Sequence, residues 1–218
     1  GDLIDLKYIR EVSKEIGCAL KNKKDYHVVI VKSTVVPGTT DSVVIPIIEK
    51  YSGKIAGIDF GVGMNPEFLR EGVAVDDFMN PDRIVLGAMD SKVHNVMKEL
   101  YGVFDGVDTI LTNNKTAEMI KYTSNSLLAT MISFSNEIGN LCASFSDIDA
   151  VDVMTGVHLD KRVSPILENG QRIKPGIVSY LEAGCGFGGS CFPKDVNALI
   201  AHGKNNNQSM SLLNSVME

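Results

Sequence analysis

The hydrophobic positions in the first half of the chain follow two alternating periods. Apolar residues recur every three or four positions over residues 5–20, which predicts a helix with Asp5 as a plausible cap. Short runs of β-branched residues predict buried strands, and helical spacing returns between them. We expect strands at 27–32, 59–63, 83–87 and 108–112, and further helices at 43–51 and 91–101. Strands that alternate with helices predict an α/β domain with a mainly parallel sheet.

The pattern changes at Asn114, where a helical stretch begins that continues without proline or a strand signal to about Phe145. At 1.5 Å per residue, this single helix would be roughly 45 Å long. Helices of globular proteins average about 12 residues, so one of this length usually bridges two domains or forms a subunit interface. Shorter helices are expected at 149–157 and 193–202, followed by a polar linker from Lys204 and a helical stub.

Composition and charge narrow the class of protein. The 218 residues are 44% hydrophobic and carry a net charge of −6, with no basic run, so we expect a buried core and no nucleic-acid partner. No apolar stretch reaches the roughly 20 residues that span a bilayer, and the first residues lack a signal-peptide pattern. We therefore expect a cytoplasmic protein that binds no membrane. The four cysteines lack metal-ligand spacing, which predicts reduced thiols and no metal site.

A glycine-rich segment leads to Cys191. Pro193 lies near a first helical position, so Cys191 should lie at or just before a helix N-terminus, where N–H groups and the helix dipole favour a thiolate. Glycines at 184, 186, 188 and 189 would let a substrate lie against the backbone. The alternative is a glycine-rich turn with an incidental cysteine. The segment also matches G-x-G-x-x-G, but no strand follows it, so we do not interpret it as a cofactor loop.

Two further groups of polar residues are candidates for a site. Lys121 and Asn125 lie four residues apart on the predicted long helix and so share a face, although a solvated face is the simpler interpretation. The segment 65–72 places Glu67 and Glu71 four residues apart in an expected helical turn after a strand, where α/β sheets bind ligands. A capping cluster is the alternative there.

Several segments, taken together, resemble the UDP-glucose/GDP-mannose dehydrogenase family in their order and spacing. They are Lys32–Thr34, Asn65–Gly72, Asn80–Gly87, Ala117–Asn125 and Gly186–Asp195. The resemblance implies a nucleotide-sugar substrate, NAD as cofactor and no metal. It implies a two-step oxidation of a UDP-sugar such as UDP-glucose to the uronate through a cysteine-bound intermediate, with GDP-mannose or a UDP-N-acetylhexosamine as the alternative substrate.

The same resemblance assigns roles to single residues. Cys191 would form the thiohemiacetal and then the thioester, while Thr34 and Asp195 would hold a water and help to move a proton. Lys121 and Asn125 would stabilise the oxyanion, and Glu67 would be the base in thioester hydrolysis. Cofactor contacts are implied for Ser33, Thr34, Glu71 and Lys194. Substrate contacts are implied for Glu67, Phe68, Leu69, Arg70, Glu71, Lys121, Asn125, Arg172 and Phe187, with the loop from Glu182.

By resemblance, the chain is an internal fragment. Residues 1–112 would be the C-terminal part of a Rossmann-like NAD-binding domain. Residues 113–204 would be an all-α central dimerisation domain with one long helix, and residues 205–218 a linker into a missing domain. We therefore expect a homodimer through the long helix, and little turnover from this chain alone. Arg172 lies about three residues farther along the sequence from the glycine-rich segment before Cys191 than the resemblance leads us to expect. This puts its implied contact with the substrate in doubt.

Two other functions remain open. The chain would be a dimerisation module if its catalytic residues were idle. It would be a cysteine hydrolase if Cys191 worked with Glu67. However, none of the four histidines lies in a sequence pattern that would mark it as the general base of such an enzyme.

Overall fold

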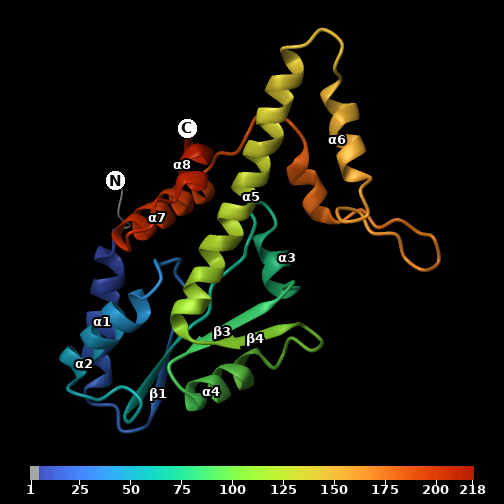
Figure 1. Ribbon diagram of the computed structural model, residues 1–218. Coiled ribbons are helices and arrows are strands. Elements are labelled where there is room, and N and C mark those ends of the chain that lie inside the picture. Colours follow the sequence, from blue (N-terminus) through green and yellow to red (C-terminus); the bar gives the residue numbers. More distant parts are fainter. Residues whose placement is uncertain (1–4) are drawn as a thin grey trace. The chain divides into compact units, whose positions relative to one another are not determined.

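The computed structural model describes residues 5–218, which fall into two compact units that meet in the sequence at residues 123 and 124 (Figure 1). The first unit contains a sheet in the order β1-β2-β3-β4. Its strands are β1 (His27–Val31), β2 (Phe60–Met64), β3 (Ile84–Ala88) and β4 (Thr109–Thr112). Each lies within one residue of its predicted position.

The sheet is mixed rather than parallel throughout. The β1–β2 and β3–β4 pairs are parallel, as predicted, while β2 and β3 run antiparallel with Met64 opposite Gly87. A parallel pair requires a crossover, usually a helix packed on the sheet. The connection from β2 to β3 contains only the short helix α3 (Ala74–Met79), which has no fully buried residue. The alternating pattern of the sequence did not reveal this reversal.

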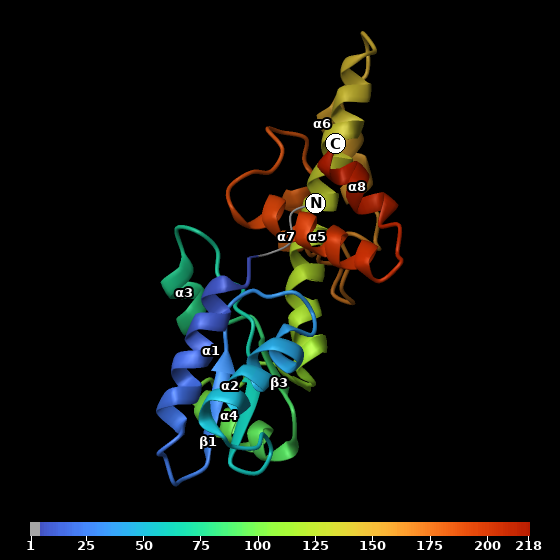
Figure 2. The ribbon, with the colours of Figure 1, turned by 90° about the vertical axis from the view of Figure 1, so that its left-hand side faces the viewer.

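Helices cover both faces of the sheet (Figure 2). One face packs against α1 (Lys7–Leu20), α2 (Ile45–Ser52) and the π-helical turn Thr40–Val44 that precedes α2. The other face packs against α4 (Ser91–Tyr101). The N-cap of α1 is Leu6, one residue after the predicted Asp5. The carboxylate of Asp5 still accepts a hydrogen bond from the backbone N–H of Lys7, the first residue of the helix, at 2.8 Å.

The second unit is helical. Its first element is the continuation of α5 (Asn114–Ala143), a single helix of 30 residues whose first ten residues belong to the first unit. The helices that follow are α6 (Ala150–His158), the 3₁₀ helix η2 (Gly176–Leu181), α7 (Cys191–Asn205) and α8 (Ser211–Met217). Periodicity predicted all of these except η2. A cluster around Ala129, Val196 and Ile200 joins α7 and α8 to α5.

No helix in the described part of the chain, residues 5–218, is long and apolar enough to cross a membrane.

A buried carboxylate in the first unit joins α5 to the segment that follows β1. Glu118 is 0% exposed and accepts hydrogen bonds from Gly38 N at 2.5 Å, Thr40 N at 2.8 Å and Thr40 Oγ1 at 2.7 Å. Burial raises the pKa of Glu118 above its ordinary value of 4.5, although the three hydrogen bonds oppose the shift, and the nearby charge of Asp41 adds slightly to it. The ionised form is therefore costly to bury.

This shift predicts how the stability of the first unit varies with pH. A raised folded-state pKa contributes stability below the unfolded value of about 4.3 and loses it as the pH rises through the folded value. The unfolding free energy of the wild type, minus that of Glu118→Gln, should therefore fall as the pH rises above 4, by at most about 1.4 kcal/mol per pH unit. Urea unfolding at several pH values measures this difference.

The variant Glu15→Gln, which removes a carboxylate from the exposed side of α1, controls for the loss of one negative charge. A stability difference that is flat, or that rises with pH, contradicts the prediction for Glu118.

Candidate functional site

Cys191 is the first residue of α7, and its side chain is exposed. The prediction that it lies at a helix N-terminus is confirmed, and Pro193 occupies the third helical position. The N–H groups of a first helical turn have no partner within the helix, and the positive end of the helix dipole adds to their effect. Cys191 therefore lies where a negatively charged group of a ligand can accept hydrogen bonds from the backbone.

Asp195, one turn after Cys191, is 1% exposed and has two strong donors. Asn125 Nδ2 on α5 donates to Asp195 Oδ2 at 2.6 Å, and Lys194 Nζ lies 2.6 Å from Oδ1. A carboxylate without partners would be too costly to bury in this environment. The contact with Asn125 therefore fixes the first turn of α7 to α5. Lys194, predicted as a cofactor contact, is engaged with Asp195.

The glycine-rich loop before α7 is exposed from 182 to 186 and from 188 to 190. Gly186 and Gly189 have φ values of 79° and 70°, a region that other residues adopt at a cost. A Cβ at Gly184, Gly188 or Gly189 would meet nothing within 4 Å, so their faces are open to a ligand. Phe187 is half-buried, and its ring lies 6.0 Å from that of Phe192.

A second group of candidate residues lies in the first unit. Lys121 Nζ is 3.1 Å from Glu67 Oε1, with the lysine side chain 7% exposed and the glutamate side chain 31% exposed. Lys121 also lies 5.6 Å from the ring centroid of Phe68. The predicted solvated face at Lys121 is therefore wrong, because the ammonium is buried and paired. Lys121 and Asn125 are on one continuous helix, α5, one turn apart.

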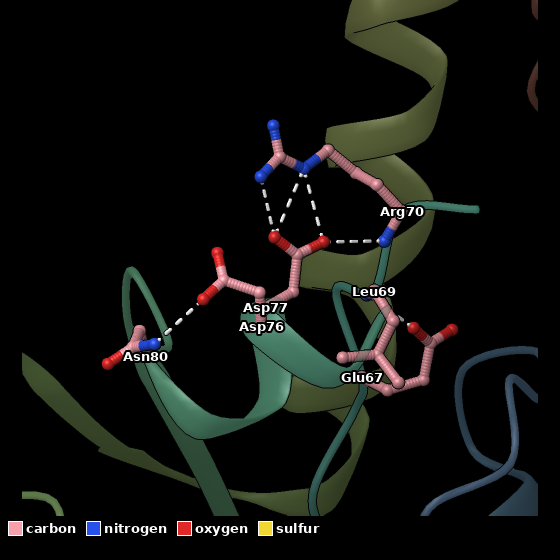
Figure 3. A network of polar contacts seen from close by, with 6 residues as sticks. All are labelled: Glu67, Leu69, Arg70, Asp76, Asp77 and Asn80. Carbon is pink, nitrogen blue, oxygen red and sulfur yellow. Dashed lines mark hydrogen bonds and ion pairs between the residues drawn. The ribbon is translucent and has the colours of Figure 1, made fainter. Parts of the chain in front are cut away.

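The segment from Glu67 to Glu71 is not helical, which corrects the prediction of a helical turn (Figure 3). It is held by hydrogen bonds to side chains. Glu67 Oε2 accepts from Leu69 N at 2.7 Å, and Asp77 accepts from Arg70 N at 2.7 Å and from Arg70 Nη2 at 2.6 Å. Arg70 lowers the pKa of Asp77, mainly through its side-chain hydrogen bonds. Glu71 is exposed.

The ion pair between Arg70 and Asp77 orients the segment more than it stabilises the unit. The Arg70 side chain is 68% exposed, and ion pairs open to water contribute little to stability because solvent screens them. With Arg70 anchored to α3 through Asp77, the side chains of Glu67 and Leu69 extend on the opposite side (Figure 3).

Polar residues also follow β1, next to the segment that follows β2. These strands are parallel and end together, with Val31 opposite Met64. Ser33 is exposed and Thr34 is half-buried. Lys32 Nζ and Tyr101 Oη both contact Asn65 Oδ1. The carboxyl ends of parallel strands are the usual position of a ligand in α/β sheets.

Arg172 lies in the second unit, between α6 and η2. Its Nη1 donates to the backbone oxygens of Leu159 and Ser164, both at 2.8 Å. These bonds join the two arms of its own loop, so within this chain its guanidinium is used to hold the loop.

The structure thus gathers Glu67, Phe68 and Lys121 in the first unit, and Cys191, Asn125 and Asp195 in the second. Sequence reasoning missed Glu118, although an acidic residue between the apolar residues Ala117 and Met119 was a signal for a buried polar contact. Among the described residues, no group of three or more histidine, cysteine or acidic side chains is arranged to hold a metal.

Comparison with known proteins covers both units. Residues 2–105 match the NAD binding domain of the UDP-glucose/GDP-mannose dehydrogenase family, and residues 115–218 match the central domain of the same family. The first match confirms the prediction of NAD as the cofactor of this family.

Some of the similar relatives are named GDP-mannose dehydrogenases, and others are named UDP-glucose dehydrogenases. The chain is 42% identical to the GDP-mannose 6-dehydrogenase of Pseudomonas aeruginosa, over 100% of this chain and 47% of the relative. It is 39% identical to the UDP-glucose 6-dehydrogenase of Haloferax volcanii, over 99% of this chain and 48% of the relative.

A solved UDP-glucose dehydrogenase from Pyrobaculum islandicum superposes with a TM-score of 0.84 at 39% identity, over 98% of this chain and 45% of that structure. The chain spans less than half the length of each of these relatives. The two domain matches and the identity across the whole chain agree, and the chain belongs to the UDP-glucose/GDP-mannose dehydrogenase family.

Proposed function

We propose that the protein to which these 218 residues belong oxidises the primary alcohol of a nucleotide sugar to a carboxylate. The observation that carries this proposal is Cys191, an exposed thiol at the start of α7, with the buried pair of Asn125 and Asp195 one turn away. A thiol in this position suits a nucleophile that attacks a carbonyl carbon. UDP-glucose is the proposed substrate and GDP-mannose the alternative, since relatives of both kinds are similar to this chain.

The proposed reaction has two oxidations and one hydrolysis. NAD⁺ supplies the chemistry of both oxidations by accepting a hydride in each. The Cys191 thiolate adds to the aldehyde carbon, and Lys121 and Asn125 stabilise the oxygen that becomes negative. After the second oxidation the sugar is a thioester of Cys191. Glu67 takes a proton from the attacking water, the C–S bond breaks, and the carboxylate leaves with the thiol restored.

The remaining residues have binding roles in this proposal. Ser33, Thr34, Glu71 and Lys194 would hold the nicotinamide end of the cofactor, a role that the exposed and half-buried hydroxyls after β1 fit. Thr34 and Asp195 would also orient the water. The segment from Glu67 to Glu71, with Arg172 and Phe187, would contact the substrate.

We assign residues 1–112 to the cofactor domain, 113–204 to the central domain and 205–218 to a linker into a further domain. The family matches at 2–105 and 115–218 support the first boundary, while the second match continues through residues 205–218. Because the chain spans less than half the length of its relatives, we expect little turnover from the 218 residues alone.

Exchange of Cys191 tests the proposed nucleophile. In the natural full-length protein, Cys191→Ser should lower the rate of NADH formation from UDP-glucose and GDP-mannose by on the order of 10³-fold or more, because the weaker nucleophile cannot form the thioester. The control Cys18→Ala removes an exposed thiol from α1 and should retain the rate. Full turnover by Cys191→Ser, or product formation without NAD⁺, contradicts the proposal; the latter result would favour the cysteine hydrolase.

We also propose that the protein dimerises through α5. Leu127, Phe134 and Leu141 are 53%, 50% and 56% exposed, and they are spaced by seven residues. Seven residues make nearly two helical turns, so the three side chains form one apolar stripe. A stripe of large apolar side chains suits a second copy of the same helix.

The stripe predicts that Phe134→Glu shifts the protein to a monomer, because a pair of carboxylates would be desolvated at the interface. Sedimentation velocity measures the dissociation constant of the dimer, which we expect to rise more than tenfold. Asn140→Glu places the same charge on another exposed position of α5 and should leave the dimer intact. A wild-type monomer, or a Phe134→Glu dimer of unchanged affinity, contradicts this proposal.

A further inference from the structure

The buried carboxylate of Glu118 joins two parts of the first unit that carry candidate residues. It binds three donors of the segment after β1, and it precedes Lys121 by three residues on α5. Residues three apart on a helix are neighbours on one face. Glu118 therefore connects the segment that bears Ser33 and Thr34 to the helical turn that bears the buried ammonium.

The start of the same segment is attached to the end of β2. Asn65 N donates to Val31 O at 2.9 Å, and Lys32 Nζ contacts Asn65 Oδ1. Asn65 is itself fixed, since its Nδ2 donates to Val85 O at 2.9 Å. Only Pro66 separates Asn65 from Glu67, so the start of the segment is tied to the carboxylate that pairs with Lys121.

These contacts close a ring. The segment from Lys32 to Thr40 is joined at its end to Glu118, and α5 leads from Glu118 to Lys121. Lys121 pairs with Glu67, and the chain leads from Glu67 back through Asn65 to the start of the segment. Inside the segment, Val35 is 3% exposed and anchors it in the core. Every step of the ring lies within the first unit.

The stability of the folded unit does not by itself explain why a carboxylate is buried at position 118. Burial of Glu118 opposes its ionisation, and apolar side chains of similar size often replace buried charges without loss of stability. The carboxylate provides what an apolar side chain does not, namely acceptors with a fixed direction for Gly38 N, Thr40 N and Thr40 Oγ1.

We propose that Glu118 is a positioning residue that fixes the segment bearing Ser33 and Thr34 relative to the ion pair of Glu67 and Lys121. This inference rests on the proposed function, because the distance that Glu118 sets matters only if Thr34 and Lys121 act on the same substrate. A displacement of about 1 Å in such an arrangement costs roughly 100-fold in rate.

The test compares three variants of the natural full-length protein. Glu118→Gln keeps the shape but replaces one acceptor oxygen with an NH₂ group, which cannot accept from Gly38 or Thr40. Thr40→Val removes only the hydroxyl donor and is the milder change. Gly17→Ala is a control for lost stability outside the ring, since its Cβ would lie 2.9 Å from Tyr51 Cβ and 3.0 Å from Ile48 O.

Hydrogen exchange and steady-state kinetics are measured well below the unfolding temperature of all variants. For Glu118→Gln we expect exchange at residues 33–40 to accelerate at least tenfold, the KM for NAD⁺ to rise, and kcat to fall roughly 100-fold. Thr40→Val should change the same three quantities in the same direction, but each only several-fold. Gly17→Ala should retain the kinetics and the exchange of residues 33–40.

The inference is overturned if exchange at residues 33–40 is unchanged in Glu118→Gln, or if Gly17→Ala loses as much rate at equal stability. A wild-type protein that oxidises neither UDP-glucose nor GDP-mannose overturns the proposed function instead. In that case the exchange and the affinity for NAD⁺, measured by calorimetry, still decide whether Glu118 holds the segment in place.

Discussion

The hydrogen bond from Asn125 to Asp195 holds in place the helical turn that begins with Cys191. A carboxyl group that is 1% exposed is costly to bury unless strong donors replace the lost water, and Asn125 and Lys194 are those donors. The bond fixes the first turn of α7 to α5, and Cys191 begins that turn. The position of the thiol is therefore set by a buried polar contact rather than by the exposed glycine-rich loop that precedes it.

Helix α5 contributes to both groups of candidate residues. Glu118 and Lys121 lie in the part of the helix that belongs to the first unit, and Asn125 lies in the part that belongs to the second. Their spacings of three and four residues are those of neighbours along one side of a helix. Each is buried and each has a polar partner, so this face carries the polar chemistry, while the stripe at Leu127, Phe134 and Leu141 carries the exposed apolar surface.

The sequence predicted the elements better than the contacts between them. Strand positions and the long helix followed from periodicity, and the start of α7 at Cys191 followed from Pro193 and the glycines. Periodicity does not report strand direction, so the antiparallel pairing of β2 with β3 was not predicted. Nor did it report the irregular segment after β2, which is shaped by side-chain bonds such as that of Arg70 to Asp77. Glu118 was missed because its partners lie 78 and 80 residues away.

Mass spectrometry of a trapped intermediate tests whether Cys191 forms the covalent bond to the sugar. The natural full-length protein is mixed with NAD⁺ and a nucleotide sugar, quenched in acid within a turnover, and digested. We expect a uronyl thioester on the peptide that contains Cys191, released by hydroxylamine. An adduct on Cys185 instead, or rapid NADH formation with no adduct on any cysteine, would contradict it.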